Sequence, residues 1–182
     1  MTEMSDNRLG SSVRRLRESR QLTLRTLAER TGFSPSFLSQ VENNQASPSI
    51  ASMERIAAAL GVTLGEFFQG THLQAAPVVR SEERPVLHSG WSHAVLESLS
   101  VAGSRLHPVL VTLNPGGSSG AQAYASGAEE FALVLDGEVV LTLGDTEHAL
   151  ATEDAVTVGA GTLRRWTNRG KQPARILIVS AR

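Results

Sequence analysis

Residues 22–61, LTLRTLAERTGFSPSFLSQVENNQASPSIASMERIAAALG, limit most strongly what this chain can fold into. Thr23 and Ser34 are each placed to cap a helix with a side-chain oxygen, and Pro35 suits a first helical position, where no N–H is missed. Gly32 stands where a helix end favours a left-handed residue. The pattern predicts two short helices around a tight turn, with a third docked against them.

Helical spacing continues on both sides of that turn. Leu9, Val13 and Leu16 fall on one face of an earlier helix. Apolar residues also recur at intervals of three and four just before Gly61: Ile50, Met53, Ile56, Ala57 and Leu60. Thr63 and Glu66 form a capping box that opens a short fifth helix. The first 70 residues therefore predict a compact five-helix bundle.

The hydrophobic period changes after residue 78, where short apolar runs are broken by Gly, Asn, Asp and Pro. Asp136-Gly137 lies between two such runs and predicts a β-hairpin, because both turn positions tolerate positive φ. Many short strands with regular turns are typical of a sandwich or barrel. The expected strands lie near 93–100, 106–113, 131–135, 138–143, 146–150, 155–158, 164–168 and 174–180.

The segment GTHLQAAP, residues 70–77, separates the two halves. We expect one domain over 1–70, a linker over 71–77 and a second domain over 78–182. Cysteine is absent, which excludes disulfides and thiolate metal sites. No run approaches the roughly 18 apolar residues of a membrane span, and no signal peptide is evident, so we expect a cytoplasmic protein.

Positive charge is concentrated near the start of the chain. Residues 8–25 hold six arginines against a single acid, Glu18, although the net charge of the whole chain is −1. Such a basic segment is typical of a surface that contacts phosphates. A solvated helix face would give the same pattern.

Four groups of residues in the helical half match a known family: Leu27–Glu29, Gly32, Leu38–Glu42 and Ile56–Val62. With them the half resembles the helix-turn-helix domain of phage-repressor-type regulators, the Cro/cI class also called XRE. The resemblance implies a λ-repressor-like bundle in a transcriptional regulator. The helix that begins at Pro35 would enter the major groove of double-stranded DNA, and a twofold dimer would read a pseudo-palindromic operator.

This geometry assigns the expected DNA contacts. Gln40 can pair bidentately with adenine, and serines can bond to several bases. Thr23, Arg25 and Ser34 lie near helix starts and suit phosphate contact, although Thr23 and Ser34 could each serve only as a cap. The resemblance also implies phosphate contact at Asn43 and Asn44, which end the helix. The alternative to base contact is that Gln40 is simply a solvent-exposed polar side chain. The residues expected to contact DNA are Thr23, Arg25, Ser34, Pro35, Ser36, Ser39, Gln40, Asn43 and Asn44.

The strand-rich half matches a second family, in order, at Asn114–Gly117, Glu129–Phe131, Val134–Glu138, Asp154 and Arg164–Asn168. With these residues it resembles a cupin, the small double-stranded β-helix or jelly-roll barrel often fused to this DNA-binding domain. The overall fold class expected is thus a multidomain α + β chain. The resemblance implies a barrel that dimerises and can hold a small-molecule effector.

Metal-binding cupins take two histidines and a glutamate from the first motif and a third histidine from the second. Glu130 stands at the glutamate place. The first two histidine places fall on Tyr124 and Ser126, or on the alanine before each, and the third falls on Arg164. Arginine cannot lose its proton and so cannot bind a metal. We therefore expect no metal, no cofactor and no catalytic residue.

The same register predicts that Glu130 and Arg164 point inward from neighbouring strands. They could fill the former metal site as an ion pair, or Arg164 could bind the carboxylate or other anion of an effector. Trp166 would then supply an apolar wall and Tyr124 would cap the mouth. The expected function is a homodimeric repressor that responds to a small molecule. The alternatives are a metal-dependent cupin enzyme fused to a DNA-binding domain and a barrel that serves only as a dimerisation scaffold.

Overall fold

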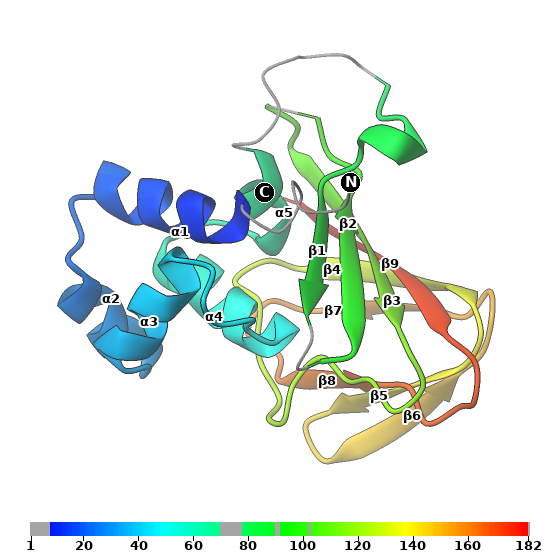
Figure 1. Cartoon of the computed structure of the whole chain (residues 1–182). Helices are drawn as coiled ribbons and strands as arrows, with labels where there is room; N and C mark the ends of the chain where they lie inside the picture. Colours follow the sequence, from blue (N-terminus) through cyan, green and yellow to red (C-terminus); the bar gives the residue numbers. More distant parts are fainter. Residues whose placement is uncertain (1–7, 70–77, 90–91, 102, 182) are drawn as a thin grey trace.

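Helices and strands form two adjoining halves of the molecule (Figure 1). The computed structural model describes residues 8–69, 78–89, 92–101 and 103–181, so the predicted linker lies outside the described residues. The α-helices precede residue 70 and the β-strands follow residue 85. No helix in the described ranges is long and apolar enough to cross a lipid bilayer.

The five helices are α1 (Arg8–Ser19), α2 (Leu24–Thr31), α3 (Pro35–Glu42), α4 (Ile50–Ala59) and α5 (Leu64–Gln69). Their predicted end signals are confirmed. Thr23 and Ser34 each accept a hydrogen bond from the N–H three residues later, at 3.0 and 3.1 Å. Gly32 is left-handed, with φ 68°. Thr63 and Glu66 make both bonds of the capping box, at 2.6 and 3.2 Å.

The apolar stripes of these helices meet in a shared core that contains Val13, Leu27, Leu38, Val41 and Ile56, each at most 1% exposed. Helix α3 packs against both α1 and α2, and α4 packs against α2 and α5. Because each helix is short, burial of these stripes supplies most of its stability. The bundle is therefore one packed unit.

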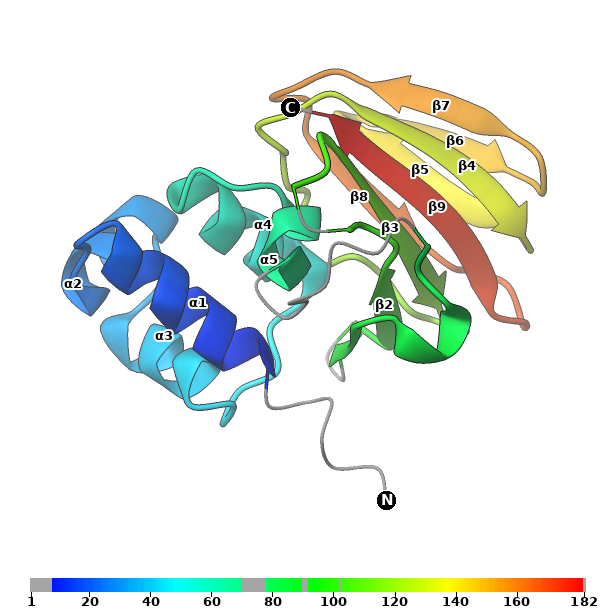
Figure 2. The same cartoon turned by 90° about the horizontal axis from the view of Figure 1, so that it is seen from above.

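The strands form two antiparallel sheets, as predicted for a barrel. Six strands pair in the order β1-β2-β3-β9-β4-β7, and three pair in the order β6-β5-β8. Figure 2 shows the second sheet lying across the first. The strands are β1 (Val86–Ser89), β2 (Ala94–Ser98), β3 (Leu106–Leu113), β4 (Glu130–Asp136), β5 (Val139–Leu143), β6 (Thr146–Leu150), β7 (Ala155–Val158), β8 (Arg164–Thr167) and β9 (Ala174–Ala181).

The predicted hairpin at Asp136-Gly137 is wrong. Strand β4 pairs with β7 and β9, whereas β5 pairs with β6 and β8, so this turn carries the chain from one sheet to the other. Gly137 does adopt positive φ, at 79°, which permits the reversal. The partners of β4 come from distant strands that local turn chemistry does not specify. A two-residue hairpin occurs instead at Gly144, where Leu143 pairs with Thr146.

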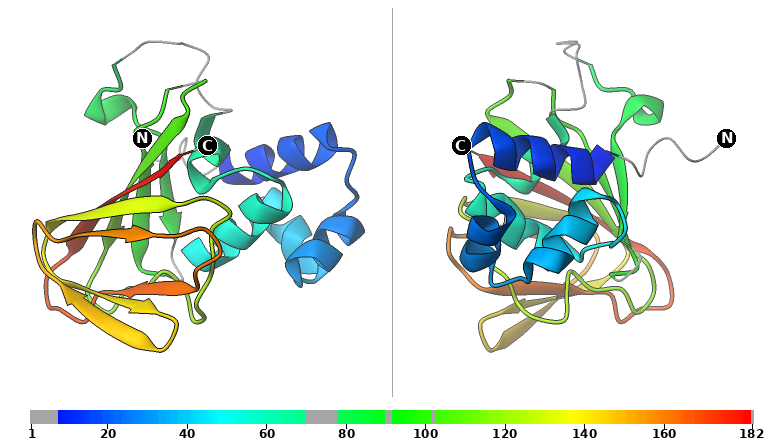
Figure 3. Two further views of the ribbon diagram at one scale, coloured as in Figure 1. Left: turned by 180° about the vertical axis from the view of Figure 1, so that it is seen from behind. Right: turned by 60° about the vertical axis from the view of Figure 1, so that its left-hand side comes forward.

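Helices α4 and α5 lie against the barrel, and α1, α2 and α3 lie on the side away from it (Figures 2 and 3). The backbone N–H of Ala51 in α4 donates to the carbonyl of Ser119 at 2.8 Å. Helix α5 approaches β3 so closely that a Cβ on Gly65 would stand 2.6 Å from the Cβ of His107. The two halves are thus in direct contact through α4 and α5.

Candidate DNA-reading surface and barrel site

Helix α3 presents its polar side to solvent and its apolar side to the bundle. Leu38 and Val41 are at most 1% exposed and anchor the helix. Six of the residues expected to contact DNA lie on or beside it, all exposed except the half-buried Ser39: Ser34, Pro35, Ser36, Ser39, Gln40 and Asn43. The capped N-terminal end of α3 is therefore open to solvent. Because the sequence predicts that this helix enters a major groove, α3 is hereafter called the reading helix.

A nearly buried ion pair fixes the end of the reading helix. Arg17 of α1 donates two hydrogen bonds to the carboxylate of Glu42, at 2.7 and 3.0 Å, and a third to the carbonyl of Leu22 at 2.8 Å. The bond to Glu42 raises the pKa of Arg17 above its ordinary value. Arg17 belongs to the basic segment of the sequence, but here it holds the bundle together.

The turn after the reading helix also packs against α1 and is hydrogen-bonded to it. Asn44 adopts positive φ, at 56°, and its Oδ1 accepts from the N–H of Gly10 at 3.1 Å. A Cβ on Gly10 would stand 2.4 Å from the carbonyl oxygen of Glu42, so only glycine permits this approach. Asn44, expected to contact phosphate, thus also positions α1.

The remaining expected phosphate contacts lie at the start of α2. Thr23 is exposed while it caps the helix, and its Oγ1 lies 2.9 Å from the hydroxyl of Thr26. Arg25 pairs with Glu29 at 3.3 Å, but their side chains are 86% and 66% exposed. An ion pair this exposed is weak and can exchange its partner for a phosphate. Helix α2 packs against the reading helix, so both groups of residues belong to one unit.

Inside the barrel, Arg164 is fully buried and its NH2 group pairs with Glu130 Oε2. The prediction that these residues lie on neighbouring strands is wrong: Glu130 begins β4 in the large sheet, and Arg164 begins β8 in the small one. They meet because the two sheets face each other across the interior. Burial alone would lower the pKa of Arg164, but Tyr124 and the nearby carboxylates raise it above its ordinary value.

Tyr124 lies beside Arg164 rather than at an open mouth. The two residues exchange backbone hydrogen bonds of 2.9 and 2.8 Å, and the guanidinium carbon stands 4.9 Å from the centre of the phenol ring. Burial raises the pKa of Tyr124, so its hydroxyl keeps its proton. The ring and the guanidinium form one face of the site, with a cation–π contact between them.

Two hydrogen-bond donors on β8 are left without a partner in the described part of the chain. They are Nε of Arg164 and Nε1 of Trp166, and both side chains are at most 2% exposed. A buried donor without an acceptor costs about 1–3 kcal/mol. Both of these unmatched groups are hydrogen-bond donors.

Helix α4 contributes a carboxyl group that was not expected. Glu54 is 5% exposed and lines a small cavity with Glu130 and Tyr124. Burial raises the pKa of Glu54 to about 8, the Glu130 carboxylate adds to the rise and Arg164 opposes it. The sequence carries one signal for this residue: Glu54 follows Ile50 by four positions on the apolar stripe of α4.

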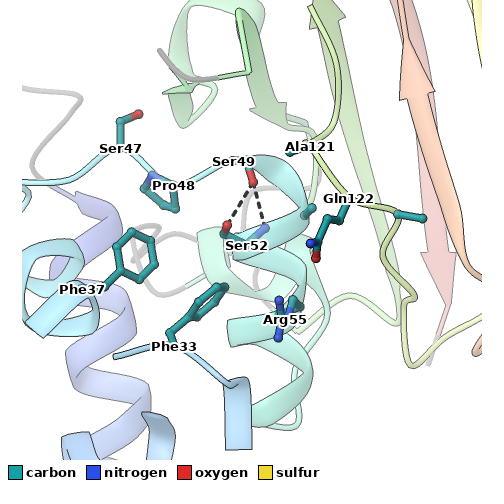
Figure 4. A pocket seen from close by; sticks show the side chains of 11 residues that line it. Phe33, Phe37, Ser47, Pro48, Ser49, Ser52, Arg55, Ala121 and Gln122 are labelled. Carbon is teal, nitrogen blue, oxygen red and sulfur yellow. Dashed lines mark hydrogen bonds between the residues drawn. The ribbon is translucent and has the colours of Figure 1, made fainter. Parts of the chain in front are cut away.

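A second hollow, of about 280 Å³, lies where the reading helix, α4 and the loop before Tyr124 meet (Figure 4). Phe33 and Phe37 line it with ring centres 5.0 Å apart, and the Arg55 guanidinium stands 4.7 Å from the Phe33 ring. Arg55 also donates to the carbonyl of Thr31 at 2.6 Å. These contacts tie α4 to the start of the reading helix.

Among the described residues, no group of three or more His, Cys, Asp or Glu side chains is arranged to hold a metal ion. Glu130 has its carboxylate committed to Arg164, and the buried His107 lies 3.9 Å from Glu66. Tyr124 and Arg164, two of the residues that the sequence comparison places at histidine positions of metal-binding cupins, contact each other.

Comparisons with known proteins agree with both halves. A family model described as helix-turn-helix matches residues 13–67, and one described as a cupin domain matches residues 109–180. The regulator PuuR of Escherichia coli is 27% identical, covering 96% of each chain. A crystal structure of an HTH_3-family transcriptional regulator from Vibrio cholerae has a TM-score of 0.76 at 23% identity, covering 98% of this chain and 97% of that one. Hydroxypropylphosphonic acid epoxidase from S. wedmorenis has a TM-score of 0.50 at 21% identity, covering 98% and 100%.

The exposed reading helix on a packed bundle, joined to a β-barrel, defines a DNA-binding protein with an accessory domain. More specifically, the chain is a helix-turn-helix transcriptional regulator of the XRE type that carries a cupin domain.

Proposed function

We propose that this regulator is a cytoplasmic, homodimeric repressor that reads a pseudo-palindromic operator and responds to a small anionic effector in its cupin barrel. The observation that carries the DNA-reading part is the reading helix itself. Its N-terminal end is capped by Ser34 and open to solvent, while Leu38 and the Arg17–Glu42 pair fix its direction. A rigid support of this kind is needed for reading base edges.

Within that proposal the DNA contacts divide by role. Gln40 and the serines of the reading helix face the base edges, where a glutamine amide matches adenine. Thr23 and Arg25 at the start of α2 contact phosphates, as do the free N–H groups at the two helix starts. Ser34 both caps and contacts the backbone. The full proposed set is Thr23, Arg25, Ser34, Pro35, Ser36, Ser39, Gln40, Asn43 and Asn44.

The effector site consists of Arg164, Glu130, Tyr124 and Trp166. Support for an anion comes from hydrogen-bond chemistry: both unmatched groups on β8 are donors. A carboxylate supplies up to four acceptor positions and can bind the planar guanidinium in a bidentate manner. No metal is involved in this proposal, since the position of the third cupin histidine is an arginine paired with Glu130.

The proposed homodimer is supported by the outer side of the large sheet. On β4, Ala132 and Val134 point into the barrel, whereas Phe131 is 43% exposed. The half-buried Val179 of β9 lies directly across from Phe131 in the register. An exposed apolar face on paired strands suits a second copy of the chain. Analytical ultracentrifugation of Phe131→Asp against the native chain tests this, with a shift to monomer expected.

The operator-reading proposal is tested by selection from a random-sequence DNA library with the full chain. The expected result is enrichment of a two-part motif with half-sites about one helical turn apart or a multiple of it. Fluorescence anisotropy on the selected DNA should show affinity falling steeply with salt. Recovery of a library without any enriched motif would contradict sequence-specific reading.

We further propose that the chain is not an enzyme. The epoxidase likeness is one of fold, and an enzyme of this fold that needs a metal would need ligands where Tyr124 and Arg164 stand. Equilibrium dialysis of the full chain against Fe²⁺, Mn²⁺ and Zn²⁺ tests this. Binding near one ion per chain that is lost in Glu130→Gln would support the enzyme alternative instead.

A further inference from the structure

The mouth of the barrel is closed by the helical domain. Glu54 and Ile50 of α4 and Leu64 and Gly65 of α5 line the cavity over Glu130. That cavity measures about 20 Å³. This is room for about one water molecule, far below the roughly 300 Å³ or more of an ordinary ligand pocket. A molecule larger than water therefore does not fit in this cavity while α4 and α5 remain docked.

The group that α4 places in the barrel is itself a carboxyl. Glu54 faces Glu130 of β4 and Arg164 of β8 closely enough to act on both electrostatically. Tyr124 from the loop and His107 from β3 also line this cavity. Because burial raises its pKa to about 8, the docked Glu54 is a neutral carboxyl group at lower pH, so it takes up the space of an effector's carboxylate beside Arg164 without supplying its charge.

We propose that Glu54 makes α4 a built-in competitor of the effector, so that a small carboxylate ligand and the docked helical domain exclude each other at Arg164. This inference rests on the proposed effector site. It adds a way in which an effector bound in the barrel can change the position of the DNA-reading surface. A ligand can shift such an equilibrium only by its preference for the open arrangement. Here the ligand prefers the open arrangement because the cavity of the docked arrangement is too small to hold it.

Release of α4 would move the reading helix relative to the barrel. The bundle moves as a unit, because α3 packs against α1 and α2, and α4 packs against α2 and α5. Its release would also part the apolar core, which continues from α4 and α5 into the barrel. The contacts that would be lost include the Ala51–Ser119 hydrogen bond and the Ser89 hydroxyl bond to the Pro48 carbonyl, at 2.8 and 2.9 Å. In a dimer held by the barrels, this movement changes the spacing of the two reading helices.

The sequence offers a steric wedge that leaves the site itself intact. A Cβ on Gly120 would stand 2.6 Å from the Cβ of Ala51, so Gly120→Ala pushes α4 off the barrel without changing Glu54 or Arg164. Gly65→Ala is a second wedge, against His107. Gly127→Ala is the matched control, since nothing lies within 4 Å of its Cβ and its φ is not positive.

The test is calorimetric titration of each full-length variant with acetate, and with methylammonium as the probe of opposite charge. Both wedge variants should bind acetate about tenfold or more tightly than Gly127→Ala, because the apparent Kd is the intrinsic Kd divided by the open fraction. Glu54→Ala should do the same, and adding Arg164→Gln to it should abolish the gain. Circular dichroism and slower-exchanging core amides confirm that each variant is folded.

Three results would overturn the inference. One is acetate binding in folded wedge variants that equals that of Gly127→Ala. Another is equal amide exchange at Ala51 in wedge and control variants, which would show that α4 stays docked. The third is a gain for methylammonium in place of acetate. Operator affinity measured on the same variants separates this inference from the proposed function. If the wedge variants bind acetate more tightly but bind DNA as before, the competition at Arg164 is supported and the proposed response of DNA binding to an effector is contradicted.

Discussion

Arg17 of α1 holds both carboxylate oxygens of Glu42 at the end of the reading helix, and the two side chains are only 12% and 5% exposed. Glu42→Gln should lower the free energy of unfolding by up to about 3 kcal/mol, because it removes the main counter-charge of the largely buried Arg17, whose remaining ion pair is a 3.5 Å contact with the exposed Glu18. Urea unfolding measures this. The control is Glu29→Gln, whose pair with Arg25 is mostly exposed, so its loss should leave the free energy of unfolding nearly unchanged.

The sequence predicts structural features set by neighbouring residues better than features set by residues far apart in the chain. The helix limits were predictable because the capping oxygens of Thr23 and Ser34 and the left-handed Gly32 act within one turn of chain. The Asp136-Gly137 hairpin failed because turn chemistry permits a reversal but does not choose the strand that pairs next. That choice belongs to β9, which begins at Ala174.

The barrel site shows the same division. The inward direction of Glu130 and Arg164 followed from the family motifs, but their placement on opposing sheets depends on pairing over the whole domain. Glu54 was missed because its environment is created by contact between the two halves. An acid on the apolar stripe of α4 was visible in the sequence, and nothing local says what buries it.

Gln40→Ala should weaken binding to the selected operator by about 1–3 kcal/mol and relax base preference at one position of each half-site, because an amide pair to adenine is lost. Competition anisotropy with single-base operator variants measures both effects. Gln45→Ala is the control, since Gln45 is exposed just beyond the reading helix. Equal preference for all four bases in the native chain at every position near Gln40 would contradict this assignment.

Gly10→Ala should destabilise the chain by about 1–3 kcal/mol, the usual cost of overpacking. Inside a helix this change normally stabilises by about 1 kcal/mol. Here the new Cβ would lie 2.4 and 2.5 Å from the backbone oxygens of Glu42 and Val41, which cannot rotate away, so the clash decides the sign. Thermal unfolding beside Gly127→Ala checks it. A raised Tm would show that α1 can shift without cost.

Glu54 should make the folded chain less stable as pH rises from about 4.5 to about 8. Burial raises the pKa of Glu54 to about 8 in the native state, whereas the unfolded chain has its ordinary value of 4.5. Between these values the native state holds a proton that the unfolded state has lost, so the contribution of Glu54 falls by up to about 1.4 kcal/mol per pH unit and is constant above pH 8.

Glu54→Gln keeps the shape of the protonated acid and cannot ionise, so its unfolding free energy should decline less over this range. Urea unfolding at pH 5, 6, 7 and 8 gives the difference between the two curves. Glu147→Gln is the control: Arg169 lowers the pKa of Glu147, which therefore titrates at more acidic pH. Its curve should run parallel to that of the native chain. A Glu54→Gln curve that also runs parallel would mean that Glu54 is already ionised when α4 is docked.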